Sequence, residues 1–321
     1  MIAASIATGL GWLGRQGTRA IAAVVFLGIA VPPLDALLKP FVSEAIFALL
    51  CIAFLRVDPA ALRLYFGRPL LPLVAAGWTM LALPLVFGVG CLAVGLPARA
   101  PDLFVAVMLQ AVAPPMMAAP AFAAVMGLDA TLVLATLVVS MAATPLTAPF
   151  FARVFIGPAL AIPALTLGLR LLAMLVGSLV AGAVLRRLFG AERIARRKAE
   201  LDGLNIVVVF VFVAAVMENV AARFAAAPLT MAALTALAFA TSGAVLAATA
   251  FVLRRVDGRE RAFALAMMAS QRNMGLMLAA TGGALPDLAW LYFALCQFPI
   301  YLAPQLLRPV ARRLRPPSLA V

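Results

Sequence analysis

The sequence contains no histidine, few charged residues and only three cysteines. Without histidine, the chain lacks the commonest general base and the commonest metal ligand of proteins. Cys51, Cys91 and Cys296 lie far apart in apolar segments and form no paired motif, so we expect buried free thiols. Charged residues make up 12% of the 321 residues, which leaves too little polar surface to cover a soluble protein of this length.

Hydrophobic residues are correspondingly abundant. They make up 66% of the sequence, and the mean hydropathy is +1.12, whereas soluble domains are roughly 45–50% apolar. A lipid bilayer can solvate such a chain, and no polar stretch is long enough to form a second domain. We therefore expect residues 1–321 to form a single all-α polytopic membrane domain.

The net charge of +13 comes mainly from arginines in short loops between apolar runs. This placement is typical of a membrane protein, whose basic loops record its orientation and contact anionic lipid. We therefore expect membrane lipid, and not nucleic acid, to be the partner of these charges.

Ten apolar segments approach or exceed the ~20 helical residues that cross the ~30 Å hydrocarbon core of a bilayer. Several of the breaks between them carry proline or glycine, as helix ends should. The segments are 19–38, 40–55, 69–95, 102–126, 129–156, 159–185, 202–223, 228–253, 261–285 and 288–310. Residues 2–13 precede them as a short amphipathic or interfacial piece.

The basic loop residues predict an orientation. With the N-terminus inside, the outer side holds Lys39, Arg99, Arg153 and Arg223. The inner side then holds Arg15, Arg19, Arg56, Arg63, Arg68, Arg186, Arg187, Arg193, Arg196, Arg197, Lys198, Arg254, Arg255, Arg259, Arg261, Arg308, Arg312, Arg313 and Arg315. The positive-inside rule therefore places both termini in the cytoplasm, with residues 311–321 as a basic tail. We expect the membrane to be a bacterial inner (plasma) membrane.

The second half of the chain repeats the spacing of the first. Adding 158 to the bounds of the second to fifth segments gives ranges that overlap the seventh to tenth, and Asp129 maps onto Asp287. The halves, about 19–156 and 159–310, hold five segments each, so the second copy must enter the membrane from the opposite face. Inverted repeats of this kind are typical of secondary transporters. Chance spacing of similar helices is the alternative.

Two matching segments are interrupted. The fourth contains Ala113-Pro114-Pro115, where two prolines remove two backbone donors. The ninth contains the most polar stretch within any segment, Ser270-Gln271-Arg272-Asn273. Unpaired backbone groups at membrane depth must line a cavity or face protein, and half-helix ends suit ions and carboxylates. We interpret the two breaks as a substrate and ion site, with ordinary proline kinks as the alternative.

Arg272 lies eleven residues inside the start of its segment, or ~16 Å, which is near the bilayer midplane. An arginine at this depth is costly and is a functional candidate by default. A structural ion pair with Glu44 or Glu218 is the alternative. The remaining candidate site residues are Thr79, Thr136, Ser140 and Gln297, although polar groups in membrane helices usually bond to their own backbone or to a neighbouring helix.

These features resemble the bile acid:sodium symporter family, within the wider group that includes arsenite-efflux and auxin-efflux carriers. The similarity covers nearly all ten segments and is strongest in Ala113-Pro114-Pro115, Gly127-Leu128-Asp129 and Ser270-Gln271-Arg272-Asn273. The resemblance implies two inverted five-helix repeats arranged as a panel and a core, with interrupted helices four and nine crossing at the centre. It also implies alternating access and sodium-driven transport of organic anions, with Asn273 at the asparagine of the family's Glu-x-Gly-x-Gln-Asn motif.

The chain departs from the family at the residues that would bind sodium. In this sequence the family's motif glutamate is replaced by Met268, its glycine by Ser270 and its glutamine by Arg272. The family's serine–asparagine pair is replaced by Ala119 and Pro120, and a further glutamine is replaced by Thr79. Because sodium needs several oxygen ligands, most of its expected site is missing, and we expect no cofactor. We hypothesise that Arg272 supplies a fixed positive charge where the relatives bind sodium.

The sequence thus favours a secondary active transporter of a small organic anion. Uniport, exchange and proton-linked transport are alternatives, and Glu44, Glu218 and Asp129 are the acids placed to carry a proton. A membrane-embedded enzyme is disfavoured because the segments hold neither histidine nor a pair of aspartates. A sensor or scaffold is the other non-transport alternative, and assembly into a homo-oligomer is compatible with the sequence.

Overall fold

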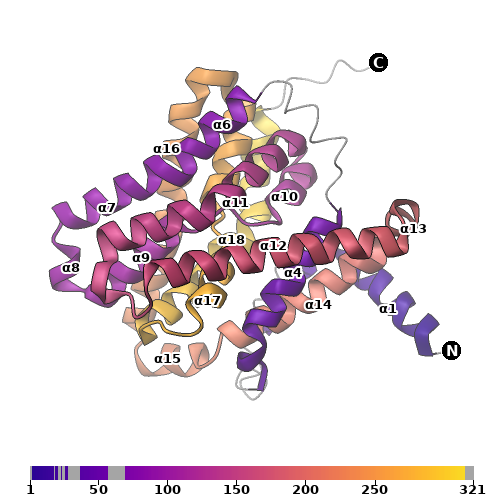
Figure 1. Cartoon of the computed structure of the whole chain (residues 1–321), viewed down its shortest axis with the longest axis horizontal. Helices are drawn as coiled ribbons and strands as arrows, with labels where there is room; N and C mark the ends of the chain where they lie inside the picture. Colours follow the sequence, from indigo (N-terminus) through magenta and orange to yellow (C-terminus); the bar gives the residue numbers. More distant parts are fainter. Residues whose placement is uncertain are drawn as a thin grey trace.

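The computed structural model describes residues 2–17, 19–20, 23, 26–27, 37–56 and 69–314 (Figure 1). Every regular element within these ranges is a helix, and they contain no strand. Most of the first predicted segment, 19–38, and all of the tail beyond residue 314 lie outside the described residues.

The predicted segments from the second to the tenth all form helix, with bounds within about five residues of those expected from hydropathy and helix-end signals. The helices are α1 (Ile2–Gln16), α4 (Val42–Arg56), α6 (Leu70–Gly77), α7 (Leu83–Ala93), α8 (Leu96–Arg99), α9 (Pro101–Val112), α10 (Ala119–Met126), α11 (Ala130–Phe151), α12 (Ala164–Phe189), α13 (Ala191–Arg196), α14 (Lys198–Val216), α15 (Val220–Ala226), α16 (Pro228–Ser270), α17 (Met274–Thr281) and α18 (Asp287–Leu314). A π-helical turn, Trp78–Ala82, joins α6 to α7.

The helix α16 consists of two arms. Asp257 and Gly258 leave helical geometry, and Gly258 has a φ of +75°, which glycine adopts without steric cost. The first arm corresponds to the eighth predicted segment. The second arm and α17 together correspond to the ninth segment, because the helix stops at Ser270 and restarts at Met274.

Five helical stretches among the described residues are long and apolar enough to cross a membrane. They are Leu70–Ala93, Ala130–Ala159, Ala164–Phe189, Lys198–Ala226 and Pro228–Ser270. The other helices miss this criterion for visible reasons: α4 has only 15 residues, the fourth and ninth segments are interrupted, and α18 contains three prolines and Gln297. These features are those of an all-α membrane protein.

Large side chains on the outer faces agree with a lipid environment. Leu70, Leu146 and Leu165 are each more than 70% exposed, which would leave extensive apolar surface in water. Cys51, Cys91 and Cys296 are free and buried, as predicted.

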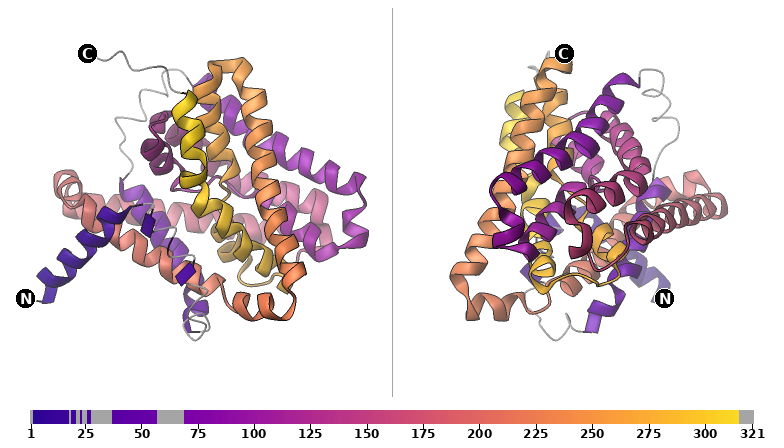
Figure 2. Two further views of the ribbon diagram at one scale, coloured as in Figure 1. Left: turned by 180° about the vertical axis from the view of Figure 1, so that it is seen from behind. Right: turned by 60° about the vertical axis from the view of Figure 1, so that its left-hand side comes forward.

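The helices form two groups. In one group α4 packs against α12 and α14, and α1 lies along α14 (Figures 1 and 2). The α1–α14 approach is close because Gly14 and Gly203 face the partner backbone, where a Cβ on either would collide with a carbonyl oxygen. In the other group α9, α10 and α11 pack with α16 and α18.

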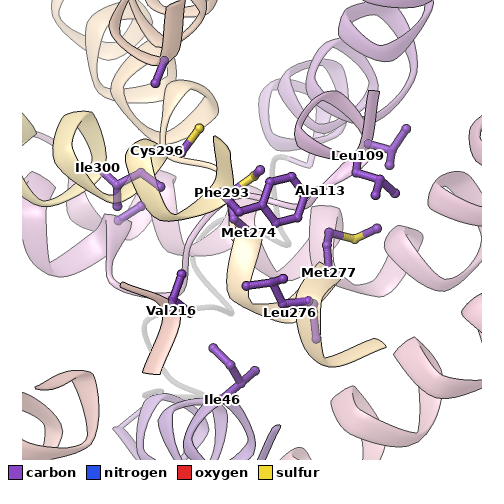
Figure 3. Packing of buried hydrophobic residues seen from close by; sticks show 14 of the residues in the cluster. Ile46, Leu109, Ala113, Val216, Met274, Leu276, Met277, Phe293, Cys296 and Ile300 are labelled. Atoms are coloured by element: carbon purple, nitrogen blue, oxygen red, sulfur yellow. The ribbon is translucent and has the colours of Figure 1, made fainter. Parts of the chain in front are cut away.

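The helix α17 lies where the two groups meet. Figure 3 shows Leu276 of α17 between Phe293 of α18 and Ile46 of α4, with Met274 beside Phe293. Gly275 permits this approach, because a Cβ there would overlap the end of Ile46 and the ring of Phe212 in α14.

Candidate functional site

The two interrupted segments cross each other at their breaks. The amide N of Met116 donates to the carbonyl of Gln271, and the amide N of Asn273 donates to the carbonyl of Pro114, both at 2.7 Å. Pro115 and Arg272 therefore form an isolated antiparallel β-bridge. The bridge satisfies backbone groups that the two interrupted helices leave free in the buried interior.

Proline chemistry explains the first break. Pro114 and Pro115 lack backbone donors, and the residue before a proline is pushed out of helical geometry. Ala113 accordingly has φ −62° and ψ 142°, and α9 ends at Val112. The chain becomes helical again at Ala119, and Pro120 occupies the first turn of α10, where a missing donor costs little.

The second break contains no proline. Gln271 is the first residue with non-helical geometry, at φ −93° and ψ 86°. Asn273 then caps α17, because its Oδ1 accepts a hydrogen bond from the amide N of Leu276 at 3.0 Å. The second break is thus held open by its pairing with the first and by a side-chain cap.

Arg272 is 2% exposed, and its guanidinium is bound by carbonyl oxygens. Its Nη1 donates to the carbonyl of Ala113 at 2.9 Å, and Nη1 and Nη2 both donate to the carbonyl of Thr79 at 3.3 Å. Its Nε has no hydrogen-bond partner. Within the described ranges no carboxylate oxygen lies within 4.0 Å of this guanidinium.

The suggested ion pair of Arg272 with Glu44 or Glu218 is therefore wrong. Glu218 instead pairs with Lys39 at 2.5 Å, and Glu44 is exposed on the first turn of α4. Glu44 lies in the first turn of α4 and Glu218 lies just beyond the last residue of α14, whereas Arg272 lies inside its interrupted segment, between Ser270 and Met274.

The carbonyl of Thr79 is available because of the π-helical turn that precedes α7. In this turn the amide N of Leu83, which would serve Thr79 in an α-helix, donates to Trp78 instead. The next residue in the π pattern is Pro84, which has no N–H to donate. The turn and the proline together leave one carbonyl oxygen of the third segment free for Arg272.

A cavity of about 440 Å³ lies against the crossing. Arg272, Asn273 and Gln297 line it on the side of the interrupted helices and α18, and α4 and α14 line the opposite side with apolar side chains such as Leu50 and Phe212. The cavity extends to the C-terminal end of α4 and the N-terminal end of α14, where Arg56 and Lys198 lie. Its lining is thus mostly apolar, with cationic groups at the crossing and toward those helix ends.

A second cavity, of about 380 Å³, lies at the N-terminal end of α4 and the C-terminal end of α14. Lys39 stands beside it, paired with Glu218 and 5.3 Å from the ring centroid of Trp290 in α18. The half-helix α17 contributes Gly275 to the first cavity and Leu278 to the second. One short helix therefore lies between the two cavities.

The predicted site residues fall into three sets. Arg272, Asn273 and Gln297 line the 440 Å³ cavity, and Pro114 and Pro115 form the crossing. Ser270 and Gln271 are buried beside the crossing but do not line that cavity, and Gln271 keeps one unbonded oxygen. In the third set the side chains face their own backbone: each hydroxyl donates to the carbonyl one turn earlier in its own helix. These residues are Thr79, Thr136 and Ser140.

Arg56 entered the sequence-based prediction only as a loop charge, and Asp202 only as the start of the seventh segment. They pair across α4 and α14 at 2.8 Å and both line the 440 Å³ cavity, and Nε and Nη2 of Arg56 have no hydrogen-bond partner. Arg170 of α12 was not singled out either, although its Nη1 donates to the carbonyl of Ala280 near the end of α17, at 3.4 Å. An arginine within a predicted segment was a usable signal for Arg170.

No protein-family model matches the chain, and no curated protein matches it at a significant level. The part of the chain that the structure describes contains no cluster of three or more cysteine or acidic residues that could hold a metal ion. The chemistry available at the site is therefore that of a buried cation, amide groups and carbonyl oxygens beside an apolar cavity.

Proposed function

We propose that this protein is a secondary transporter that carries a small organic anion across the membrane by alternating access. The observation that carries the proposal is the buried guanidinium of Arg272, which has no carboxylate partner among the described residues and lies at the crossing of two interrupted helices beside a 440 Å³ cavity. Interrupted helices at membrane depth are the usual binding sites of secondary transporters. A buried ionisable group in such a place marks a substrate or ion pathway.

The spacing of the helices supports the proposal. Adding 157, one residue less than the offset found in the sequence, to the bounds of α4, α9, α10 and α11 gives ranges close to those of α14, the second arm of α16, α17 and α18. The same addition exchanges the two hydrogen bonds of the crossing, because 115 becomes 272, 114 becomes 271 and 116 becomes 273. Our interpretation is that the crossing lies on a pseudo-two-fold axis between two five-helix repeats, as in the family that the sequence resembles.

In this interpretation α4, α12 and α14 belong to a panel, and the interrupted helices belong to a core. The two cavities lie between these groups at opposite ends of α4 and α14. A rocking motion of the panel against the core would open one cavity while it closes the other, which is the alternating-access motion of inverted-repeat carriers.

Ion pairs between helices support the expected sidedness. Each pair joins two residues that the loop charges assign to the same side of the membrane, and among the described residues none joins an inner to an outer position. The interhelical pairs are Arg56–Asp202 and Arg261–Asp129 inside, and Lys39–Glu218 and Arg223–Asp287 outside. By this assignment the cavity beside Arg272 lies toward the cytoplasmic side of the membrane, because Arg56 and Asp202 line it.

The lining of that cavity favours an anion with an apolar body. Uniport, exchange and proton-linked symport are compatible with it, and Asp202 is the acid that lines it. Sodium coupling is disfavoured because the residues replacing the family's sodium ligands include Met268, Ala119 and Pro120, which offer no side-chain oxygen.

The test begins with a screen of carboxylates, sulfonates and sulfate conjugates for thermal stabilisation of the purified protein. Uptake of the best radiolabelled compound into proteoliposomes then compares the wild type with Arg272→Met and with a matched control, Arg153→Met, whose residue is exposed. We expect accumulation by the wild type and the control, and an anion affinity about tenfold or more weaker in Arg272→Met. Uptake into protein-containing liposomes that never exceeds uptake into empty liposomes would contradict the proposal.

A further inference from the structure

We propose that the Arg272 guanidinium is a tethered cation, which occupies a cation position built from main-chain carbonyl oxygens and so makes a separately bound coupling cation unnecessary. The inference rests on the proposed transport function and specifies how its site works. It predicts that truncation of Arg272 uncovers a site for small guanidinium compounds or monovalent cations.

The oxygens that form this position come from two separate elements. Thr79 belongs to the π-helical turn of the third segment, and Ala113 precedes the double proline of the fourth. The Thr79 carbonyl lacks a helical donor because Pro84 has no N–H, and the Ala113 carbonyl lacks one because α9 ends at Val112, before the double proline. Both carbonyls nevertheless accept hydrogen bonds from the same guanidinium, at 2.9 and 3.3 Å.

Converging carbonyl oxygens at a helix break are ligands for a hard cation. In this protein the cation is part of the chain: Arg272 enters the crossing through its bridge with Pro115 and presents its two Nη groups to the two carbonyls. A covalently attached cation need not be recruited from solution and cannot dissociate during the transport cycle. The position is therefore permanently filled.

Truncation of the side chain should leave two buried carbonyls without donors and a vacant space of guanidinium size. The variant Arg272→Ala is therefore expected to lower the thermal unfolding midpoint of the purified protein. Millimolar methylguanidinium or ethylguanidinium, far below denaturing concentrations, should restore most of the loss. Methylurea has a similar shape but no charge and should not restore it.

The controls separate a specific site from a general salt effect. Wild type and Arg153→Ala receive the same additives and should not respond, because Arg153 is exposed. Sodium, potassium and lithium chloride are compared with choline chloride at equal ionic strength. Failure of Arg272→Ala to respond to any guanidinium compound or alkali cation would overturn the inference, as would an unfolding midpoint equal to that of wild type.

A second pair of variants keeps the test decisive if Arg272→Ala fails to fold. Pro84→Ala supplies an N–H that can donate to the Thr79 carbonyl in the π pattern, so the double variant with Arg272→Ala should be recovered in higher yield and be more stable than the single variant. Arg272→Lys retains a tethered charge and should not respond to added cations. Equal behaviour of the single and double variants, or a lysine variant as cation-sensitive as Arg272→Ala, would overturn the inference.

The proposed function and this inference fail separately. Strong sodium stimulation of wild-type flux would contradict the tethered-cation inference but not the proposal of anion transport. Specific rescue of Arg272→Ala by guanidinium compounds without any protein-dependent flux would contradict the transport proposal but not the carbonyl-bound cation position.

Discussion

The side-chain cap of α17 can be removed without changing the backbone bonds of the crossing. Asn273 Oδ1 accepts from the amide N of Leu276 at 3.0 Å, while its own amide N donates to Pro114. Asn273→Ala deletes only the first of these contacts. An N-cap contributes about 1 kcal/mol, and up to about 2. A buried N–H left without a partner costs about 1–3 kcal/mol. Because Asn273 lines the cavity, water can meet part of the lost bond, and we expect a cost of about 1–2 kcal/mol.

Asp129 provides a matched comparison. Its Oδ1 caps α11 by accepting from the amide N of Leu132 at 2.9 Å, away from the crossing. We expect Asn273→Ser to restore the cap, and Asp129→Ala to lower thermal stability in detergent by as much as Asn273→Ala or by up to about 1 kcal/mol more, because it also removes the partly exposed ion pair with Arg261. Only Asn273→Ala should also raise the KM for the anion in proteoliposomes, because α17 begins at the site. Equal unfolding midpoints for wild type and Asn273→Ala, or equal KM effects of the two alanine variants, would refute this account of the cap.

Two further predictions concern the contact between panel and core. Gly275→Ala places a methyl group against Ile46 and Phe212, and it should cost about 1–3 kcal/mol of stability and slow transport. Gly243→Ala is the control: its methyl group meets nothing within 4 Å, and it should raise stability by up to about 1 kcal/mol. A chemical unfolding series in which both variants behave alike would contradict the packing argument. Glu218→Gln removes the charge that pairs with Lys39. Because this partly exposed pair is worth at most about 1 kcal/mol, the variant should fold while the 380 Å³ cavity opens more often. Ser43 lines that cavity and the native cysteines are buried, so a membrane-impermeant thiol reagent should label Ser43→Cys several-fold faster in the Glu218→Gln background. An unchanged labelling rate would exclude the Lys39–Glu218 pair as a closure of this cavity.

The helices and their interruptions could be predicted from the sequence because both depend on local chemistry. Apolar runs mark helices in a bilayer, and Pro114-Pro115 must interrupt one of them. The interruption at Arg272 was predictable only from its polar residues and from its matching place in the second half. The details of the site were less accessible, because every residue carries a carbonyl oxygen and no sequence pattern marks the one that an arginine will bind.

Thr79 illustrates this limit. The sequence singled out its hydroxyl, yet that group donates to Ala75 in its own helix, and the carbonyl oxygen is the group that meets Arg272. Its availability depends on a π-helical turn, and residue propensities do not place such a turn. Arg56 and Asp202 were missed for a related reason, since their pairing depends on how α4 and α14 pack.

In the proposed mechanism, the charge of Arg272 also selects an anion over a cation in the cavity. Hydrogen bonds to the carbonyls of Thr79 and Ala113 satisfy its donors but leave its net charge uncompensated, because the described residues place no carboxylate beside it. At an effective dielectric constant of about 20, an opposite unit charge about 6 Å away gains about 3 kcal/mol, which is about a hundredfold in affinity. A sodium ion at the same distance is disfavoured by the same amount. In the proposed mechanism, the arginine that attracts an organic anion to the crossing therefore also opposes the cation that would otherwise drive transport. Anion affinity and sodium independence should be lost together when the charge at position 272 is removed.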